Sequence, residues 1–312
     1  MIYKHYEYFM TIAELGSITK AAEKLYVSQP SLSQYVKRLE NELGVVLFDR
    51  KSSPLTLTYA GEKYYDSVKQ VMRIEDGVIR EFEEINSEIR GKLRLGVALW
   101  RGACLLPEVF PQYHSKYPAV ELELTEGRSI QLINALRNDA IDIAVMNLPH
   151  TIDYSHLICD VIQEERILLA APTYHPAVQK LLSEKEGNTE DAGELPIAPI
   201  ALVNELPVIL TKEGQNLTHE VRFAFNRHRL DPEILLETGN LTTGINLVVE
   251  GMGCAFVPEG GAKICTHPGL VTFFRTDDDE MKWPLAAVYR KDAYLSRMAR
   301  LFIEELRNSL SN

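Results

Sequence analysis

The chain has 312 residues, of which 46% are hydrophobic, and it carries a formal net charge of −11 at pH 7. This length allows two or three domains that each bury a core. No run of eighteen apolar residues occurs, and the N-terminus lacks the basic and apolar stretches of a signal peptide, so neither a membrane partner nor export is expected. Four cysteines without metal-ligand spacing favour reduced thiols in a cytoplasmic protein that holds no metal or other cofactor: Cys104, Cys159, Cys254 and Cys265.

Two short helices joined by a tight turn are predicted between residues 17 and 43. Ser17 is placed to cap the first helix and Ser28 to cap the second, in whose first turn Pro30 is tolerated. The buried stripes follow helical spacing, with Ile18, Ala21, Ala22 and Leu25 in the first helix and Leu32, Val36, Leu39 and Leu43 in the second. This pattern is typical of a helix-turn-helix that reads DNA.

The outward face of the second predicted helix suits the major groove. Short serine side chains let the backbone approach a duplex, and glutamine can pair with N6 and N7 of adenine. Base readout is therefore expected from Gln29, Ser31, Ser33 and Gln34. Lys37 and Arg38, one turn further on, are placed to meet phosphates or guanine edges. The alternative is a surface helix that is merely polar on its solvent side.

A short hairpin with a basic, turn-rich tip is predicted between residues 45 and 57. A wing beside a recognition helix supplies a second phosphate contact, so this neighbour favours DNA binding over the plain surface helix. Phosphates are expected to be positioned mainly by Ser28, Lys37, Arg50, Lys51 and Thr58. The full set of expected DNA-binding residues is Ser17, Ser28, Gln29, Pro30, Ser31, Ser33, Gln34, Lys37, Arg38, Arg50, Lys51 and Thr58.

These segments resemble the N-terminal domain of LysR-type transcriptional regulators. The residues that carry the resemblance are 13–17, 21–22, 25, 28–33, 39–40, 43–44, 47–50 and 57–61. A looser match continues at 105–107, 117–118 and 247–253, leading to 257–258. The resemblance implies a winged helix-turn-helix DNA-binding domain over 1–57, a dimerisation linker helix over 58–90 and an effector-binding domain over 91–312.

The net charge is unevenly distributed along the chain. Residues 1–60 carry seven Lys/Arg against six Asp/Glu, a net charge of +1, whereas residues 61–90 carry −3 and the remainder −9. The acidity therefore lies away from the expected DNA face. A domain this weakly cationic should depend on a few well-placed contacts and on dimerisation, and should lose DNA readily as salt rises.

Residues 58 to about 89 are predicted to form one long helix that Thr58 caps. Its apolar residues follow alternating steps of three and four, interrupted by Glu75 and with Gly77 within the series: Tyr64, Val68, Val71, Val78, Phe82, Ile85 and Ile89. An apolar stripe with this spacing predicts packing against a partner helix. The alternative is an amphipathic helix that packs on its own chain. The resemblance implies dimerisation here, and a symmetric dimer would read an interrupted inverted repeat.

From residue 91 strands alternate with helices, which predicts an α/β domain with a mostly parallel sheet. The predicted strands are 92–98, 120–124, 141–146, 166–171, 208–210, 234–236, 254–257, 271–274 and 285–289. The predicted helices are 105–116, 130–136, 217–229, 242–250 and 295–310, with an exposed acidic loop at 183–194. The return of the chain predicts crossovers near 161–166 and 264–270, which join lobe I (91–161 and 269–312) to lobe II (162–268). This arrangement resembles a periplasmic-binding-protein-like effector module.

A two-lobed α/β module places its ligand in the cleft, at the C-terminal ends of strands and the N-terminal ends of helices. Loops after strands are thus expected to line the cleft, and their hydroxyls, amides and basic side chains suit a small organic anion. The expected effector-binding residues are Trp100, Arg101, Arg128, Ser129, Asn147, Thr211, Lys212, Thr242 and Thr243. Each of them could instead be a helix cap or a solvated charge, and the bulk of Trp100 and Arg101 could narrow or close the pocket.

Several alternatives remain open. The sequence has no nucleophile elbow, no phosphate-binding glycine-rich loop and no histidine pair at helical spacing, so an enzyme is not expected. A stand-alone solute-binding protein would not need the first sixty residues. A constitutive DNA-binding protein whose C-terminal module only oligomerises stays possible. The family includes redox sensors, and Cys254 with Cys265 could form such a pair, but buried inert thiols are favoured.

The sequence is therefore interpreted as a ligand-responsive regulator of transcription. Its expected partners are double-stranded DNA, a small organic effector acting as co-inducer, RNA polymerase and a second copy of the chain. The resemblance further implies that dimers pair into tetramers.

Overall fold

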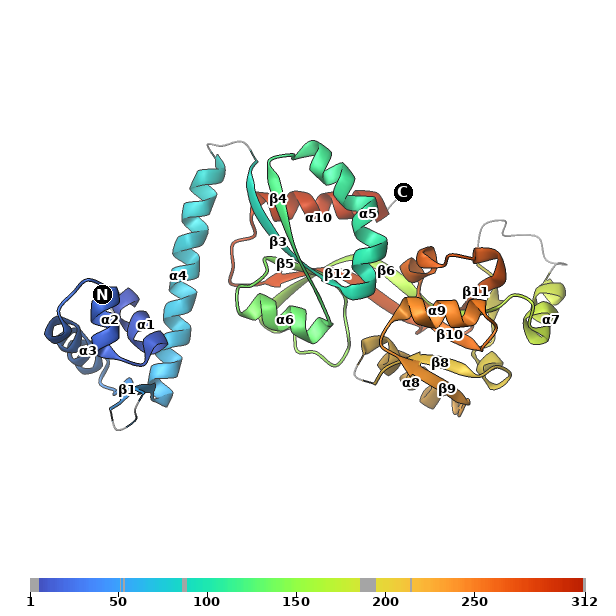
Figure 1. Ribbon diagram of the computed structural model, residues 1–312, viewed down its shortest axis with the longest axis horizontal. Coiled ribbons are helices and arrows are strands. Elements are labelled where there is room, and N and C mark those ends of the chain that lie inside the picture. The colour runs from blue at the N-terminus through green and yellow to red at the C-terminus, as the bar shows by residue number, and fades with distance from the viewer. Residues whose placement is uncertain are drawn as a thin grey trace. The chain divides into compact units, whose positions relative to one another are not determined.

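The computed structural model describes residues 6–50, 52, 54–85, 89–185, 195–213 and 215–310. The chain divides into two compact units, one made of residues 1–86 with 292–294 and the other of residues 87–291 with 295–312 (Figure 1). Among the described residues, no helix is both long and apolar enough to span a bilayer.

The N-terminal unit packs its elements around one small core. These elements are α1 (Tyr6–Leu15), α2 (Ile18–Lys24), α3 (Gln29–Leu43), the hairpin strands β1 (Phe48–Asp49) and β2 (Thr56–Leu57), and α4 (Tyr59–Ile85). Side chains from α1, α3, the hairpin and the start of α4 meet in this core, among them Phe9, Leu32, Phe48 and Val68. The helix-turn-helix and the hairpin were predicted, whereas α1 was not assigned as an element.

The three predicted N-caps of this unit, Ser17, Ser28 and Thr58, are confirmed. The Ser17 hydroxyl accepts a hydrogen bond from the Lys20 amide at 3.3 Å, and the Ser28 hydroxyl accepts one from the Ser31 amide at 3.3 Å. Each cap satisfies one amide that the start of a helix leaves unpaired. Thr58 acts in the same way for α4, because its Oγ1 accepts from the Gly61 amide at 3.0 Å and donates to the Val46 carbonyl at 2.6 Å.

Helix α4 changes its environment along its length. Tyr64 and Val68 are buried in the N-terminal core, whereas Ile74 and Phe82 are 60% and 63% exposed. The long helix was predicted to run to about residue 89, but Ile89 packs against the core of the C-terminal unit. The expectation that Ile89 belongs to the apolar stripe of the linker helix is therefore wrong.

The C-terminal unit alternates strands and helices as predicted, except that a helix over Pro176–Lys185 was not predicted. This helix includes residues 183–185 of the expected acidic loop, and residues 186–194 lie outside the described residues. The elements of the unit are β3 (Gly91–Ala98), α5 (Leu99–Lys116), β4 (Val120–Gly127), α6 (Ser129–Arg137), β5 (Ile143–Asn147), β6 (Leu157–Pro172), α7 (Pro176–Lys185), β7 (Ile197–Ala198), β8 (Val208–Thr211), α8 (Asn216–His228), β9 (Ile234–Thr238), α9 (Leu241–Val249), β10 (Cys254–Pro258), β11 (Val271–Thr276), β12 (Lys282–Arg290) and α10 (Arg297–Leu310). Short 3-10 turns occur at Ile200–Asn204, Glu259–Ile264 and Pro268–Leu270.

The described strands of this unit form one hydrogen-bonded sheet, ordered β4-β3-β5-β12-β6-β10-β8-β9, with β11 and β7 branching from β6. Pairing is parallel among β3, β4 and β5 and among β10, β8 and β9. It is antiparallel wherever β6 or β12 pairs with the strands beside it on this path. Each lobe thus contains a parallel α/β sheet, and the two sheets are joined by the antiparallel strands β6 and β12.

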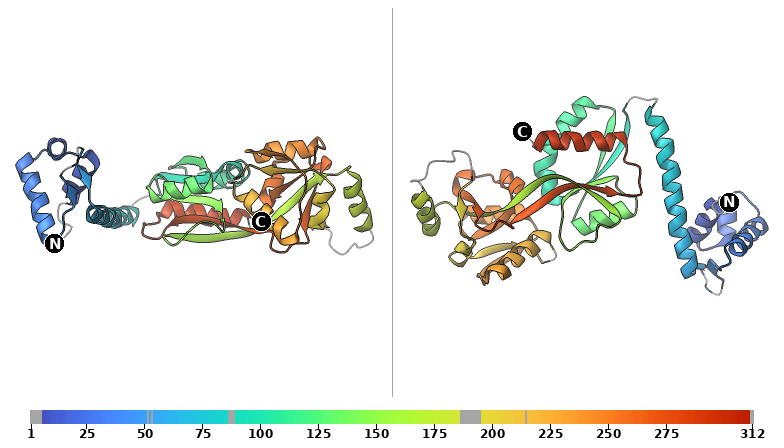
Figure 2. Two further views of the ribbon diagram at one scale, coloured as in Figure 1. Left: turned by 90° about the horizontal axis from the view of Figure 1, so that it is seen from below. Right: turned by 180° about the vertical axis from the view of Figure 1, so that it is seen from behind.

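Strand β6 belongs to both lobes. Its residues 157–166 pair with β12, and its residues 167–172 pair with β10 and β11. Figure 2 shows β6 (yellow-green) and β12 (orange-red) side by side through the middle of the unit. In lobe I the strands are covered on both faces, since Ile143 and Val145 face the core under α5 and α10, while Ala144 and Met146 face the core under α6.

Two predicted boundaries differ from the structure. The return to lobe I was expected at 264–270, but β11 still pairs with the lobe II half of β6, so the return lies between Thr276 and Lys282. The segment 259–265 is short and irregular, yet Ile264 and Cys265 pack on the lobe II core. Helix α5 was expected to begin at Leu105 and begins at Leu99, so Pro107 and Pro111 lie well inside the helix and not in its first turns.

Candidate functional site

The first turns of α3 carry an exposed polar face. Six side chains that were expected to meet DNA are exposed there, namely Gln29, Pro30, Ser31, Gln34, Lys37 and Arg38, while Ser33 is half-buried. The exposed Ser28 lies at the start of this face, where its hydroxyl is 2.7 Å from that of Ser31. The geometry therefore presents glutamine amides and serine hydroxyls at one end and two cations a turn or more further on.

The hairpin is tied to α3 by Glu40. Its Oε1 accepts from the Leu47 amide at 2.9 Å and the Phe48 amide at 3.3 Å, and its Oε2 accepts from Arg50 at 2.9 Å. Arg50 is exposed but forms an ion pair with this carboxylate. The positioning role of Glu40 was missed, because nothing in its local sequence distinguishes it from a solvated charge on a helix.

Two of the remaining residues that were expected to contact DNA already use their side chains within the fold. Ser17 and Thr58 are half-buried, and both use their hydroxyls as helix caps. Lys51 lies outside the described residues.

A cavity of about 700 Å³ lies between the lobes of the C-terminal unit. Six of the nine expected effector residues line it, namely Trp100, Arg128, Ser129, Asn147, Thr211 and Thr242. The other lining residues are Ala98, Leu99, Ala103, Glu126, Gly127, Ile130, Thr151, Ile152, Gln215, Asn216, Leu217, Gly239, Asn240, Leu241 and Trp283. Lys212 and Thr243 are exposed and do not belong to the lining.

Four helices begin at this cavity. The first residues of α5, α6, α8 and α9 are Leu99, Ser129, Asn216 and Leu241. The N-cap residue before each of them also lines the cavity, and of these four N-cap residues only Arg128 is charged. Ala98 and Gln215 make no side-chain cap, so the first amides of α5 and α8 keep hydrogen-bonding capacity. Amides at helix starts favour anions, and the exposed Arg128 adds a positive charge at the start of α6.

Arg101 has a different environment from the one expected. Its side chain is 2% exposed, its Nη1 donates to Glu165 Oε1 at 2.8 Å, and its Nη2 donates to Asn147 Oδ1 at 2.7 Å and to Glu165 Oε2. The Trp100 ring stacks on the guanidinium, with 3.9 Å between Cζ and the ring centroid. Arg101 does not line the cavity, and its charge is already matched by a buried carboxylate. Its expected part as an anion ligand is therefore not supported by its position.

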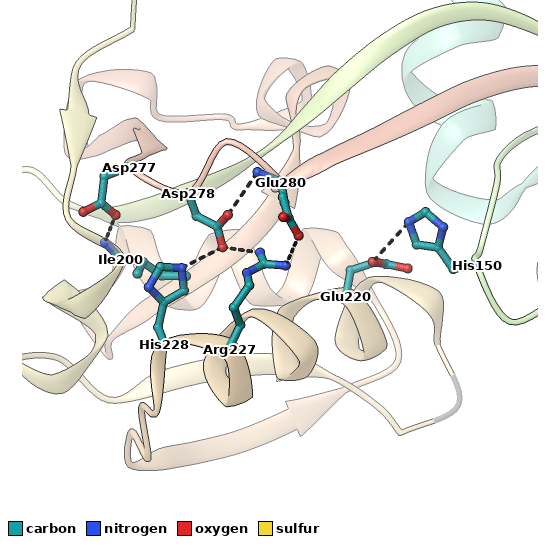
Figure 3. A network of polar contacts seen from close by, with 8 residues as sticks. All are labelled: His150, Ile200, Glu220, Arg227, His228, Asp277, Asp278 and Glu280. Atoms are coloured by element: carbon teal, nitrogen blue, oxygen red, sulfur yellow. Dashed lines mark hydrogen bonds and ion pairs between the residues drawn. The ribbon is translucent and has the colours of Figure 1, made fainter.

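Two polar contacts join the lobes. Asn216 Nδ2 on α8 donates to Ser129 Oγ on α6 at 2.7 Å, and His150 Nε2 lies 3.8 Å from Glu220 Oε2. Figure 3 shows His150 reaching toward Glu220 from the segment between β5 and β6. Away from these contacts, Lys263 Nζ donates to Glu108 at 2.8 and 3.0 Å, which joins lobe II to α5.

The segment that returns to lobe I is held by the end of α8. Asp278 accepts from Arg227 and lies 3.0 Å from His228 Nε2, while Glu280 accepts from Arg227 (Figure 3). Burial of the Asp278 carboxyl acts to raise its pKa, but hydrogen bonds from Arg227, the Glu280 amide and His228 outweigh burial and lower the pKa below its ordinary value. Asp278 is thus an ionised anchor for the return segment.

Three of the four cysteines, Cys104, Cys159 and Cys254, are in environments that disfavour a thiolate. Burial raises the pKa of Cys254 to about 12, and it also raises the pKa of Cys104 and of Cys159. A protonated buried thiol reacts slowly, so these positions fit inert residues better than a redox pair. Within the described residues, no group of histidine, cysteine and acidic side chains could hold a metal ion.

Trp283 is a cavity residue that was missed. It lies on β12 after the return segment, and a tryptophan inside a strand gives no local sign that it borders a ligand site. Gln215 and Asn216 could have been found by extending the helix-start argument to α8, whose predicted start at 217 is one residue too late.

Comparisons with known proteins agree with this architecture. A family model for the bacterial regulatory helix-turn-helix protein of the lysR family matches residues 3–62, and one for the LysR substrate binding domain matches residues 86–311. The chain is 32% identical over 308 residues to the uncharacterized HTH-type transcriptional regulator YcgK of Bacillus subtilis, covering 97% of this chain and 93% of that protein. It is 31% identical to the HTH-type transcriptional regulator BsdA of the same organism, covering 95% and 97% of the two chains.

Solved structures share the fold. HinK, a LysR family transcriptional regulator from Pseudomonas aeruginosa, has a TM-score of 0.59 at 25% identity, with 97% of this chain and 96% of that chain covered. Full-length CbnR in complex with its target DNA has a TM-score of 0.55 at 21% identity, with 97% of each chain covered. The matched family consists of transcriptional regulators and not of enzymes, and its two domains account for nearly the whole chain. The chain therefore belongs to the LysR family of DNA-binding transcriptional regulators.

Proposed function

We propose that the chain binds an interrupted inverted repeat in double-stranded DNA as a homodimer, and that a small organic anion between the lobes modulates this binding. Residues 1–57 serve as the winged helix-turn-helix, residues 58–90 as the dimerisation linker, and residues 91–312 as the effector-binding domain. A regulator of this kind acts in the cytoplasm on promoters, with RNA polymerase as its further partner and with dimers pairing into tetramers.

The exposed face of α3 supports the DNA part of the proposal. Gln29, Ser31, Ser33 and Gln34 read base edges. The residues that mainly position phosphates are Ser28, Lys37, Arg50, Lys51 and Thr58. Gln29→Ala should relax specificity, because a base contact distinguishes sequences. Arg50→Ala should weaken all sequences alike and reduce the salt slope by about one, because its charge releases a counterion.

Both variants are measured by fluorescence anisotropy over a range of salt concentrations. The probes are a duplex that the wild-type chain selects from a random-sequence library and a scrambled duplex of the same composition. If Gln29→Ala lowered affinity for the two duplexes equally, the assignment of base readout to this face would fail.

The cavity supports the effector part of the proposal, and one observation carries it. The starts of α5, α6, α8 and α9, together with Arg128, surround one cavity of about 700 Å³. Apolar side chains such as Leu99, Ile152 and Leu217 complete the lining, as expected for a site that encloses the body of a small organic molecule. Binding to this site alters transcription only to the extent that the ligand prefers one lobe arrangement over another.

The two tryptophans of the chain give this cavity a built-in signal, since Trp100 and Trp283 both line it. Small carboxylates are screened on the full chain for a dose-dependent rise in the unfolding midpoint and a change in tryptophan fluorescence. Arg128→Ala should weaken a genuine hit, whereas Lys212→Ala, which removes an exposed charge outside the lining, should not. A library without any hit would instead favour a constitutive regulator whose C-terminal unit only oligomerises.

A further inference from the structure

Tyr26 occupies an unusual backbone position in the turn between α2 and α3. The Val27 amide donates to the Ala22 carbonyl at 3.0 Å, and the Tyr26 amide donates to the Glu23 carbonyl at 3.3 Å. This pair of bonds is a Schellman motif, which ends a helix with one residue in the left-handed region. Here that residue is Tyr26, with a φ of 54°. Glycine is the usual residue at this position, because a Cβ is crowded in the left-handed conformation.

The Tyr26 side chain does nothing visible for the fold. It is 97% exposed, so the ring buries almost no surface. The apolar contact that accompanies a Schellman motif is made by the residue after the left-handed one, here Val27, which packs against the core. A bulky residue in a strained backbone position, without a stabilising contact in exchange, points to a role outside the folded chain.

The position of Tyr26 within the unit indicates which partner it meets. It lies two residues before Ser28, so its Cα is within about 7 Å of the Cα of the α3 N-cap. On its other side are Lys20 and Lys24, which are exposed one turn apart on α2. In a docked helix-turn-helix the first helix crosses the DNA backbone and the start of the second meets the bases. A residue between the two lies next to both the element that crosses the DNA backbone and the element that meets the bases.

We propose that Tyr26 is a DNA-backbone contact, in which its phenol hydroxyl donates a hydrogen bond to a phosphate oxygen. This inference rests on the proposed docking of α3 in the major groove. Because the donor is neutral and its acceptor is present at every nucleotide, Tyr26 strengthens binding to all sequences alike. It displaces no counterion, so it leaves the salt slope unchanged, in contrast to Lys37.

The experiment uses the full chain with the selected and scrambled duplexes described above. Tyr26→Gly should raise the unfolding midpoint of the N-terminal unit by about 4 °C, because the strain is relieved. It should also weaken binding to both duplexes about tenfold, the value of one hydrogen bond to a charged group. Tyr26→Phe keeps the ring and the strain, and it should weaken binding by a similar factor at an unchanged midpoint.

Arg229→Gly is the matched control, since Arg229 ends α8 in the same left-handed conformation, with a φ of 54°. It should stabilise the C-terminal unit and leave DNA binding unchanged. Lys37→Ala is the positive control, and it should lose affinity with a salt slope reduced by about one.

The outcomes distinguish failure of the Tyr26 contact from failure of the proposed docking of α3 in the major groove. If Lys37→Ala binds weakly while both Tyr26 variants bind as the wild type does, Tyr26 is not a DNA contact. Normal DNA affinity combined with a loss of activated transcription would assign Tyr26 to a protein partner and likewise overturn the inference. A Tyr26→Phe variant with wild-type affinity would overturn the hydroxyl assignment. If Lys37→Ala and Gln29→Ala also bind normally, the proposed α3 face itself is wrong.

Discussion

The guanidinium of Arg101 and the carboxylate of Glu165 form a buried ion pair beside the cavity, with Asn147 bridging them to its lining. Glu165 belongs to β6, the strand that passes between the lobes, and the Trp100 ring stacks on the Arg101 guanidinium. The Arg101 Nε is buried without a hydrogen-bond partner among the described residues. A buried charge of this kind depends strongly on its partner, because desolvation cannot be recovered from water.

Glu165→Gln should therefore destabilise the C-terminal unit by about 3 kcal/mol, since it leaves the Arg101 charge buried and unmatched. Urea unfolding followed by tryptophan fluorescence measures the change. Glu108→Gln is the control, because it removes an exposed ion pair with Lys263 and should cost less than about 1 kcal/mol. Equal losses for the two variants would contradict the distinction between the buried and the exposed pair.

Asp278 makes the free energy of unfolding fall when the solution becomes acidic. Its pKa is lower in the folded chain than the ordinary value of 3.8, so the folded state favours the ionised form. The resulting stabilisation is fully present above the ordinary pKa and disappears as pH falls through the lowered pKa. Asp278→Asn should remove this contribution at pH 7 and flatten the loss of stability below about pH 4. The exposed Asp279→Asn, in the same segment, should behave as the wild type in urea titrations at each pH.

At the scale of elements, α4 combines two functions along one helix. Its first turns complete the core of the N-terminal unit through Tyr64 and Val68, while its later turns expose Ile74, Val78 and Phe82. These three residues recur at steps of four, which places them along one stripe. An exposed stripe of large apolar side chains on a long helix is costly in water unless a second helix covers it.

Phe82→Lys should consequently weaken the proposed dimer, because it puts a charge into the stripe. Sedimentation equilibrium should show a rise in the dimer dissociation constant of at least about tenfold. A tenfold rise corresponds to no more than the free energy gained when one aromatic side chain is buried. Glu81→Lys changes charge at the adjacent exposed position and should leave the dimer largely intact. A Phe82→Lys variant that dimerises like the wild type would assign dimerisation to other surfaces.

At the scale of the C-terminal unit, two strands and a few side chains control how the lobes meet. β6 and β12 connect the lobes, and the Asn216–Ser129 hydrogen bond joins α8 of lobe II to α6 of lobe I. Both partners of that bond also line the cavity, so a ligand that competes for either hydroxyl or amide changes the contact between the lobes. This coupling is a physical route from ligand to lobe arrangement.

Ser129→Ala removes the bridge and should shift the lobes toward opening by about threefold to tenfold in population, given the net value of one hydrogen bond. Quenching of Trp100 and Trp283 by acrylamide should increase, because both rings border the cleft. Thr243→Ala changes an exposed hydroxyl outside the lining and serves as the control. Unchanged quenching in Ser129→Ala would mean that the hydrogen bond does not hold the cleft.

Features that depend on neighbours along the chain could be predicted from the sequence. Ser17 and Ser28 were identified as caps, and the segment of β5 was identified as a strand, because both depend on side chains a few residues apart. The family followed from the same local motifs. Six of the nine expected cavity residues also followed, since the start of a helix after a strand is a local feature that places its residues at one edge of a sheet.

The partners of charged and aromatic side chains, by contrast, became known only from the folded chain. Arg101 resembled an anion ligand until its pairing with Glu165, 64 positions away, was known. Trp283 reaches the cavity because β12 returns beside β6, and the return at 277–281 depends on how Asp278 meets α8. Such pairings join residues distant in sequence, and no local pattern encodes them, because the energy of a charge depends on what surrounds it after folding.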